Sequence, residues 1–179
     1  MEMRARKALG LATKCVAGLL LLIAIFAIAG LRINVTDSLP VGLYRITSGP
    51  RASYVAFCLE GTASQLSLQR GYRPSGSCPD GGAPLLKSVV AMAGDHVRLS
   101  DAGIAVNNIL LSNTAPLRQD RRGRLLEPWT FGDYLVSEGM VWVASTYNPF
   151  SYDSRYYGPI RSKQILYSLK SVLIFAGRN

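Results

Sequence analysis

The sequence predicts a mainly β protein whose antiparallel strands form packed sheets or a barrel, preceded by one N-terminal transmembrane helix. Three observations support this fold class. Cys15–Leu31 is an uncharged run of 17 residues, short runs rich in Val, Ile, Leu and Tyr alternate with turn residues after it, and no long helical periodicity follows Leu31. A chain of 179 residues that is 49% hydrophobic can bury a core, so the composition indicates one globular domain and excludes a disordered protein.

The N-terminal segment predicts the topology in the membrane. As a helix, Cys15–Leu31 spans ~26 Å at ~1.5 Å per residue, slightly less than a hydrocarbon core of ~30 Å. Basic residues precede it, so the positive-inside rule keeps residues 1–14 as a cytoplasmic tail and exports residues 32–179. Ala27–Ala29 also fits a signal-peptide cleavage site. We therefore expect a single-pass protein of the bacterial inner membrane with a periplasmic domain, or a periplasmic protein if residues 15–31 are a cleaved signal.

Strand-like runs follow one another through the exported domain. They are Gly42–Thr47, Tyr54–Leu59, Leu85–Ala93, His96–Leu99, Ile104–Val106, Tyr134–Val136, Met140–Ala144 and Ser168–Ala176. A weak helical pattern is confined to Gly61–Arg70. Two stretches interrupt the strands: residues 59–84 are rich in Gly, Ser and Pro and predict an insertion, and Pro116–Pro128 predicts a basic, exposed hairpin arm.

Charge and cysteine content narrow the function classes. The net charge of +9 raises the question of nucleic acid, but the basic residues outside the N-terminus are dispersed except for one cluster in the arm, so we expect no nucleic-acid partner. Cys58 and Cys78 bracket the insertion, and in an oxidising compartment they predict a disulfide worth roughly 3 kcal/mol. His96 is the only histidine, which argues against a metal site, and no cofactor is expected.

A serine in the stretch "TDSLPVGLYR" is a candidate nucleophile. Ser38 precedes a proline, so it fits an ordinary turn, but it also fits a hydroxyl held at a fixed place. A serine needs a base, and the sequence offers His96, which also fits a surface turn, or Lys87 in "LLKSVVAMAGD". Lys87 interrupts an apolar strand. It is either an edge lysine that points to solvent or a buried lysine whose pKa is lowered enough to act as a base.

Three blocks in order resemble the Ser/Lys type I signal peptidase family. "TDSLPVGLYR" resembles its nucleophile block, "LLKSVVAMAGD" its lysine block and "SYDSRYYGPI" its last block. "SLPVGLYR", the cysteine-bracketed insertion and the small size are similar to its conjugative-transfer branch, the TraF-like pilin-processing peptidases. "STYNPF" departs from the Gly-Asp-Asn that the family often has before the last block.

The resemblance implies a fold of the signal-peptidase type and a role for each matching residue. Ser38 would be the nucleophile, Lys87 the general base, and the Ser38 backbone N–H with the Thr36 hydroxyl the oxyanion hole. In the last block, Ser151 would hydrogen-bond Lys87. Asp153 and Arg155 would form either a structural ion pair or, for Asp153, a third part of the site.

The implied partners are a pilin precursor or another exported preprotein, the inner membrane and a conjugative transfer apparatus. Hydrolysis and cyclisation of the pilin both begin from the same acyl-serine, and the sequence does not separate them. Two alternatives stay open: a general type I signal peptidase that serves many exported proteins, and a non-catalytic envelope scaffold of a secretion complex. The second predicts that Ser38 is replaceable.

Overall fold

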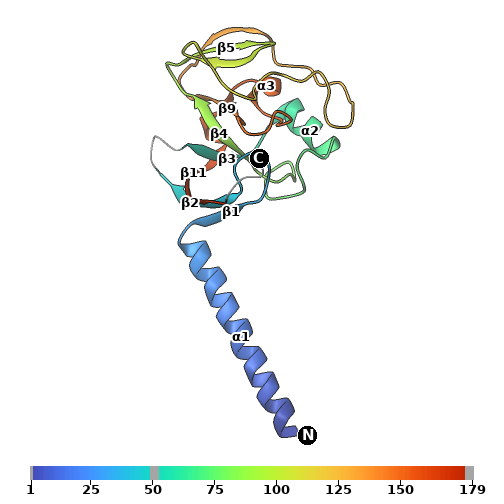
Figure 1. Ribbon diagram of the computed structural model, residues 1–179, viewed down its shortest axis with the longest axis vertical. Helices are drawn as coiled ribbons and strands as arrows, with labels where there is room; N and C mark the ends of the chain where they lie inside the picture. Colours follow the sequence, from blue (N-terminus) through green and yellow to red (C-terminus); the bar gives the residue numbers. More distant parts are fainter. Residues whose placement is uncertain (1, 49–52, 176–179) are drawn as a thin grey trace.

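The computed structural model describes residues 2–48 and 53–175, with side chains described from Thr13 onward. A long N-terminal helix, α1 (Glu2–Ile28), extends away from a body made of two antiparallel sheets (Figure 1). The helix includes residues 2–14 of the predicted tail and residues 15–28 of the predicted apolar segment. Among the described residues, no helix has the length and apolarity needed to cross a membrane, so the predicted transmembrane helix lacks support.

The larger sheet carries the elements that matter most for the site. Its seven strands lie side by side in the order β1 (Leu31–Asn34), β2 (Gly42–Thr47), β11 (Ile165–Ile174), β3 (Tyr54–Phe57), β4 (Leu85–Ala91), β9 (Met140–Ala144) and β10 (Ile160–Arg161). Neighbouring strands are antiparallel throughout. The last strand of the described residues, β11, therefore lies between β2 and β3, although more than a hundred residues separate it from either in sequence.

The smaller sheet packs against the far end of the larger one. Its order is β7 (Ile109–Leu110), β6 (Gly103–Val106), β5 (His96–Ser100) and β8 (Gly132–Leu135). Val97, Leu99 and Ile104 from this sheet form a buried cluster with Trp142 of β9. A second cluster, which includes Phe57, joins β3 and β9 to the C-terminal segment, and a third lies where β2 meets β11. In each cluster, apolar side chains that point to the same face of a sheet pack against one another and are buried.

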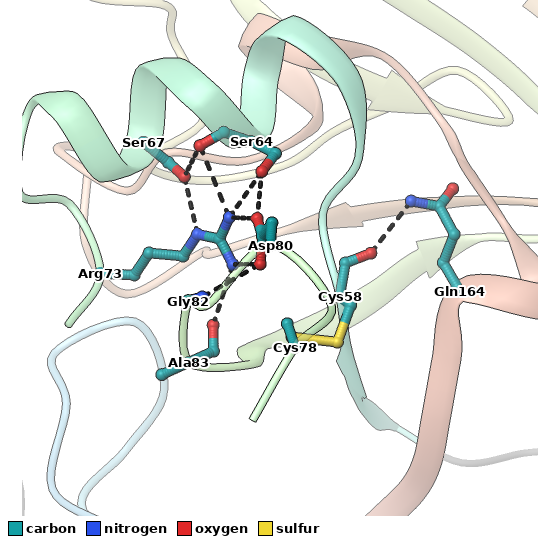
Figure 2. The surroundings of a disulfide bond; sticks show 9 residues. All are labelled: Cys58, Ser64, Ser67, Arg73, Cys78, Asp80, Gly82, Ala83 and Gln164. Atoms are coloured by element: carbon teal, nitrogen blue, oxygen red, sulfur yellow. Dashed lines mark hydrogen bonds and ion pairs between the residues drawn. A yellow bond between two sulfur atoms is a disulfide. The ribbon is translucent and has the colours of Figure 1, made fainter. Parts of the chain in front are cut away.

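The insertion folds as a stapled unit (Figure 2). It contains α2 (Gly61–Gln69), and the predicted disulfide joins Cys58 to Cys78 with a Cα–Cα separation of 5.6 Å. Beside it, the buried Arg73 guanidinium donates to Ser67 Oγ at 2.7 Å and Ser64 Oγ at 2.8 Å and pairs with Asp80. This ion pair lowers the pKa of Asp80 well below its usual range. Two short helices complete the chain: α3 (Ser154–Tyr157) and the 3-10 helix η1 (Ser162–Gln164).

The mainly antiparallel β prediction is confirmed, and each strand-like run overlaps a strand of the structure. The prediction for Ser168–Ala176 ends outside the described residues, and β11 begins three residues earlier than predicted. The alternative of a barrel is wrong for the part of the chain described, because neither sheet has a ladder that joins its two outer strands. The strands β1, β7 and β10 were not predicted: β7 and β10 have two residues each, and β1 begins at Leu31, which belongs to the apolar run of the predicted helix.

Candidate active site

The loop that carries Ser38, residues 35–41, is held by a side chain that precedes it. Asn34 ends β1 and is buried, and its amide donates to the carbonyls of Thr36 at 3.0 Å, Leu39 at 3.1 Å and Pro40 at 3.2 Å. Its Oδ1 accepts from the Thr36 hydroxyl at 2.7 Å. Tyr44 of β2 donates its hydroxyl to the Pro40 carbonyl at 2.6 Å. Both ends of the Ser38 loop are therefore fixed to the sheet.

Lys87 reaches Ser38 from the middle of β4. Pairing with β3 places Lys87 opposite Val55, and only 3% of the lysine is exposed. Its Nζ lies 2.6 Å from Ser38 Oγ, within hydrogen-bond reach. The two residues are 49 positions apart in the sequence, so this contact depends on the sheet. The lysine is buried, as one of the two sequence interpretations required.

The surroundings of Lys87 favour its neutral form. The pKa of Lys87 is lowered from its ordinary 10.5 to about 8. Burial is the main cause, the nearby Asp153 carboxylate acts in the opposite direction, and the Arg155 guanidinium acts in the same direction as burial. A lysine with a pKa of about 8 is roughly one-tenth neutral at pH 7. The pair is therefore able to move a proton from the serine hydroxyl to the amine near neutral pH.

Asp153 and Arg155 form a fully buried ion pair behind this contact. Asp153 caps α3, accepts from Arg155 Nε at 2.8 Å and accepts from the Ser145 backbone N–H at 3.0 Å. The Arg155 guanidinium also donates to the carbonyls of Pro149 and Ser151, each at 2.9 Å. This pair ties β9, the segment 145–151 and α3 together, which is consistent with its structural interpretation. It influences Lys87 through charge, since no hydrogen bond joins either residue to the lysine in the described part of the chain.

Ser151 lies near Ser38 and Lys87, but its hydroxyl forms no hydrogen bond with the described residues. Its hydroxyl is buried and has no hydrogen-bond partner among residues 2–48 and 53–175, so the predicted hydrogen bond to Lys87 is not formed in this structure. Ser151 does line the cavity that contains Ser38 and Lys87.

A cavity of about 560 Å³ opens beside Ser38. It is bounded by the Ser38 loop, the insertion, the predicted arm and the tyrosines of the last block. The lining includes Asn34, Thr36, Asp37, Ser38, Tyr72, Arg73, Leu86, Lys87, Arg121, Arg122, Arg124, Phe150, Ser151, Tyr152 and Tyr156. Its size and its mixture of aromatic and charged walls suit an extended peptide.

The structure differs from the sequence interpretation of the site at two residues, His96 and Asn34. His96 lies exposed on β5 in the smaller sheet and does not line this cavity, so the structure does not bring it to Ser38. Asn34 is a site residue that the sequence interpretation missed. The signal was an Asn two residues before a Thr at the start of a turn, a pattern typical of a side chain that bonds the following backbone.

Comparisons with known proteins agree with the three blocks. A family profile described as "Signal peptidase, peptidase S26" matches residues 6–174. The chain is 37% identical over 175 residues to the plasmid transfer protein TraF of Escherichia coli, covering 94% of this chain and 96% of that protein. It is 39% identical over 176 residues to the probable conjugal transfer protein TraF of Sinorhizobium fredii (strain NBRC 101917 / NGR234), covering 94% and 89%. A solved signal peptidase I structure from Enterococcus faecalis V583 is 20% identical with a TM-score of 0.39, covering 70% of this chain and 99% of that one.

Proposed function

Because the chain belongs to the signal peptidase family, peptidase S26, we propose that it is a serine endopeptidase in which Ser38 is the nucleophile and Lys87 the general base. The observation that carries the proposal is the 2.6 Å contact between Lys87 Nζ and Ser38 Oγ. Burial of this lysine, with a pKa of about 8, supports it. A base placed in this way contributes typically about 10²- to 10⁴-fold to the rate.

The proposed reaction proceeds through an acyl-enzyme. Neutral Lys87 takes the hydroxyl proton as Ser38 Oγ attacks the carbonyl carbon of the peptide bond. Lysine then gives this proton to the departing amine, the peptide bond breaks, and the acyl group stays on the serine. In the second half, Lys87 takes a proton from water, or from the substrate's own amine, as that nucleophile attacks the carbonyl carbon of the acyl-serine. The ester bond to Ser38 Oγ then breaks, and Lys87 returns the proton to Oγ, which restores the serine. Hydrolysis and cyclisation thus differ only in the second nucleophile.

The oxyanion that forms in each half needs donors. We assign the Ser38 backbone N–H and the Thr36 hydroxyl to this role, and loss of one such donor costs about 3 kcal/mol in the barrier. The Thr36 hydroxyl donates to Asn34 Oδ1 in the structure. It must therefore exchange this partner for the oxyanion when the transition state forms.

The relatives suggest where the enzyme acts. The two relatives described above are named for plasmid or conjugal transfer, and this supports a role in the transfer apparatus. The pilin precursor is our proposal for the substrate, and it follows from the resemblance of the three sequence blocks. We place the chain in the inner membrane, with residues 15–31 as the anchor, the N-terminus in the cytoplasm and the sheets in the periplasm. The uncharged run Cys15–Leu31 and the basic residues before it support this topology.

The test is cleavage of purified pilin precursor by the full chain in detergent. Ser38→Ala should abolish cleavage while circular dichroism stays unchanged, because the substitution removes one oxygen from a loop held by Asn34. Lys87→Arg keeps the positive charge but cannot release a proton at working pH, so it should be as inactive as Lys87→Ala. Substantial cleavage by the arginine variant would mean that Lys87 acts through its charge. Normal cleavage by Ser38→Ala would exclude Ser38 as the nucleophile, and a wild-type chain that cleaves no precursor would support a scaffold.

A further inference from the structure

The predicted arm forms one wall of the cavity that contains Ser38. We define the arginine arm as residues 117–126, which are closed by an antiparallel bridge between Gln119 and Leu125. Arg121, Arg122 and Arg124 of this arm line the same cavity as Ser38 and Lys87. A hairpin that begins 30 residues after Lys87 thus contributes charge to the cavity that contains both proposed catalytic residues.

Only part of that charge is neutralised within the protein. Arg124 Nε pairs with Asp120 at 2.6 Å, and Arg118, outside the cavity, pairs with Asp101 at 2.9 Å. Neither Arg121 nor Arg122 forms an ion pair with any residue of the described chain. Both side chains are exposed at the mouth of the cavity. They therefore offer two guanidinium groups without a carboxylate partner.

Contacts within the cavity wall hold the arm in place. The Arg121 guanidinium lies over the ring of Phe150, 4.7 Å from its centroid. Phe150 directly precedes Ser151 in the sequence. Asp120 accepts from Tyr72 Oη at 2.7 Å and from the backbone N–H of Arg122 at 2.8 Å. The Asp120 carboxylate thus binds Tyr72 of the insertion, the backbone of its own turn and Arg124, and it forms no ion pair with Arg121 or Arg122.

The balance of charge in the whole lining is positive. Among its described residues, the carboxylates are Asp37 and Asp120, whereas the guanidinium groups also include those of Arg32, Arg70 and Arg73. Of these, Arg73 is neutralised by Asp80. A cleft lined by one sign of charge focuses its potential on whatever enters, and guanidinium groups bind carboxylates with two parallel hydrogen bonds.

We propose that the arginine arm selects substrates that carry an acidic side chain close to the cleaved bond, with Arg121 and Arg122 as the groups that bind its carboxylate. The proposal rests on the peptidase function given above and adds a substrate class to it. The two arginines would contact the substrate but take no part in proton transfer. Selection through charge should act on kcat/KM and should weaken as salt rises, because exposed charges are screened.

The experiment uses peptides that span the cleavage site, acetylated and amidated so that their ends carry no charge. Glu, Gln or Lys is placed in turn at each position on either side of the bond. For the full chain in detergent at low salt, Glu at one or more positions should raise kcat/KM about five- to tenfold over Gln, with Lys poorer still. The preference should shrink in 0.5 M salt.

Charge reversal of the two arginines provides a second test. Arg121→Glu with Arg122→Glu should remove the preference for Glu and favour Lys, and circular dichroism should be unchanged because both side chains are exposed. The matched control is Lys163→Glu with Lys170→Glu, which changes the net charge equally at two exposed residues outside the cavity and should keep the preference.

Two outcomes would overturn this proposal and leave the peptidase function intact: equal cleavage of Glu and Gln peptides at every position, or a preference for Glu that persists in the Arg121→Glu, Arg122→Glu variant. If the wild type cleaves none of the peptides and no precursor, the peptidase function fails and this proposal fails with it.

Discussion

Asn34 and Thr36 hold each other in the loop that presents Ser38. The Thr36 hydroxyl donates to Asn34 Oδ1 at 2.7 Å, and the Asn34 amide donates to the Thr36 carbonyl at 3.0 Å. The same amide reaches the Leu39 carbonyl on the other side of the serine. One buried side chain therefore spans the loop, and it accepts the hydrogen bond that the Thr36 hydroxyl must redirect to the oxyanion.

Replacement of Asn34 tests this arrangement. Asn34→Ala should lower kcat about tenfold with little change in KM, because the loop loses the donor that positions Ser38 while the cavity is intact. The effect should be smaller when measured in the Thr36→Val background, since the two side chains act together. Steady-state kinetics of the four proteins of this cycle give the coupling. If the fall in kcat of the double variant equals the product of the two single effects, Asn34 does not act through Thr36.

The pH dependence of cleavage follows from Lys87. The amine acts as a base only when it is neutral, and its pKa is lowered to about 8. The rate at saturating substrate should therefore rise about tenfold per pH unit below 8 and level off above it. Stopped assays between pH 6 and pH 10 check this profile. A rate that falls over the same interval would contradict a lysine base.

Asp153 should affect both stability and this profile. Asp153→Asn leaves the Arg155 charge buried without its partner, so the free energy of unfolding should fall by about 3–5 kcal/mol. The Asp153 carboxylate raises the pKa of Lys87, so its loss should move the midpoint of the pH–rate profile to lower pH. Denaturant unfolding and the pH assay measure the two effects. Asp133→Asn, which breaks an exposed ion pair with Arg98, should change neither, and a midpoint that moves upward for Asp153→Asn would refute the electrostatic assignment.

The disulfide should stabilise the insertion. Cys58→Ser with Cys78→Ser removes a closure between residues 20 positions apart, which should lower the free energy of unfolding by about 3 kcal/mol. Cys15→Ser is the control, because Cys15 is a free, exposed cysteine outside the sheets. Denaturant unfolding in detergent compares the three proteins. Equal stability of the double variant and the control would mean that the bridge does not constrain the fold.

The local sequence was sufficient where a run of apolar residues is bounded by turn residues. The predicted bounds of β2 and β9 match the structure, and Lys87 could be identified as a buried lysine candidate because it interrupts an apolar run. The boundary at Leu31 could not be predicted in this way. The apolar run continues into β1, but Gly30 adopts a φ of +67°, ends the helical path and turns the chain into the sheet.

Tertiary relationships account for what the sequence left open in the site. The three blocks predicted which residues would meet, but the partner of each polar atom depends on side-chain orientation, as the unpartnered Ser151 hydroxyl shows. The arginine arm joins the cavity because Asp120 and Tyr72 meet across 48 positions of sequence. No local signal in either segment contains that contact.

The position of β11 has a consequence for the time at which the enzyme becomes active during its synthesis. β2, which follows the Ser38 loop, and β3, which pairs with the strand of Lys87, are not neighbours; β11 lies between them. The sheet that brings serine and lysine together is therefore incomplete until the final strand has been made and has inserted between two strands formed much earlier. Contacts this distant in sequence form late, since their loop-closure entropy must be overcome first. A chain still emerging from the ribosome or still crossing the membrane would hold both residues without the geometry to use them.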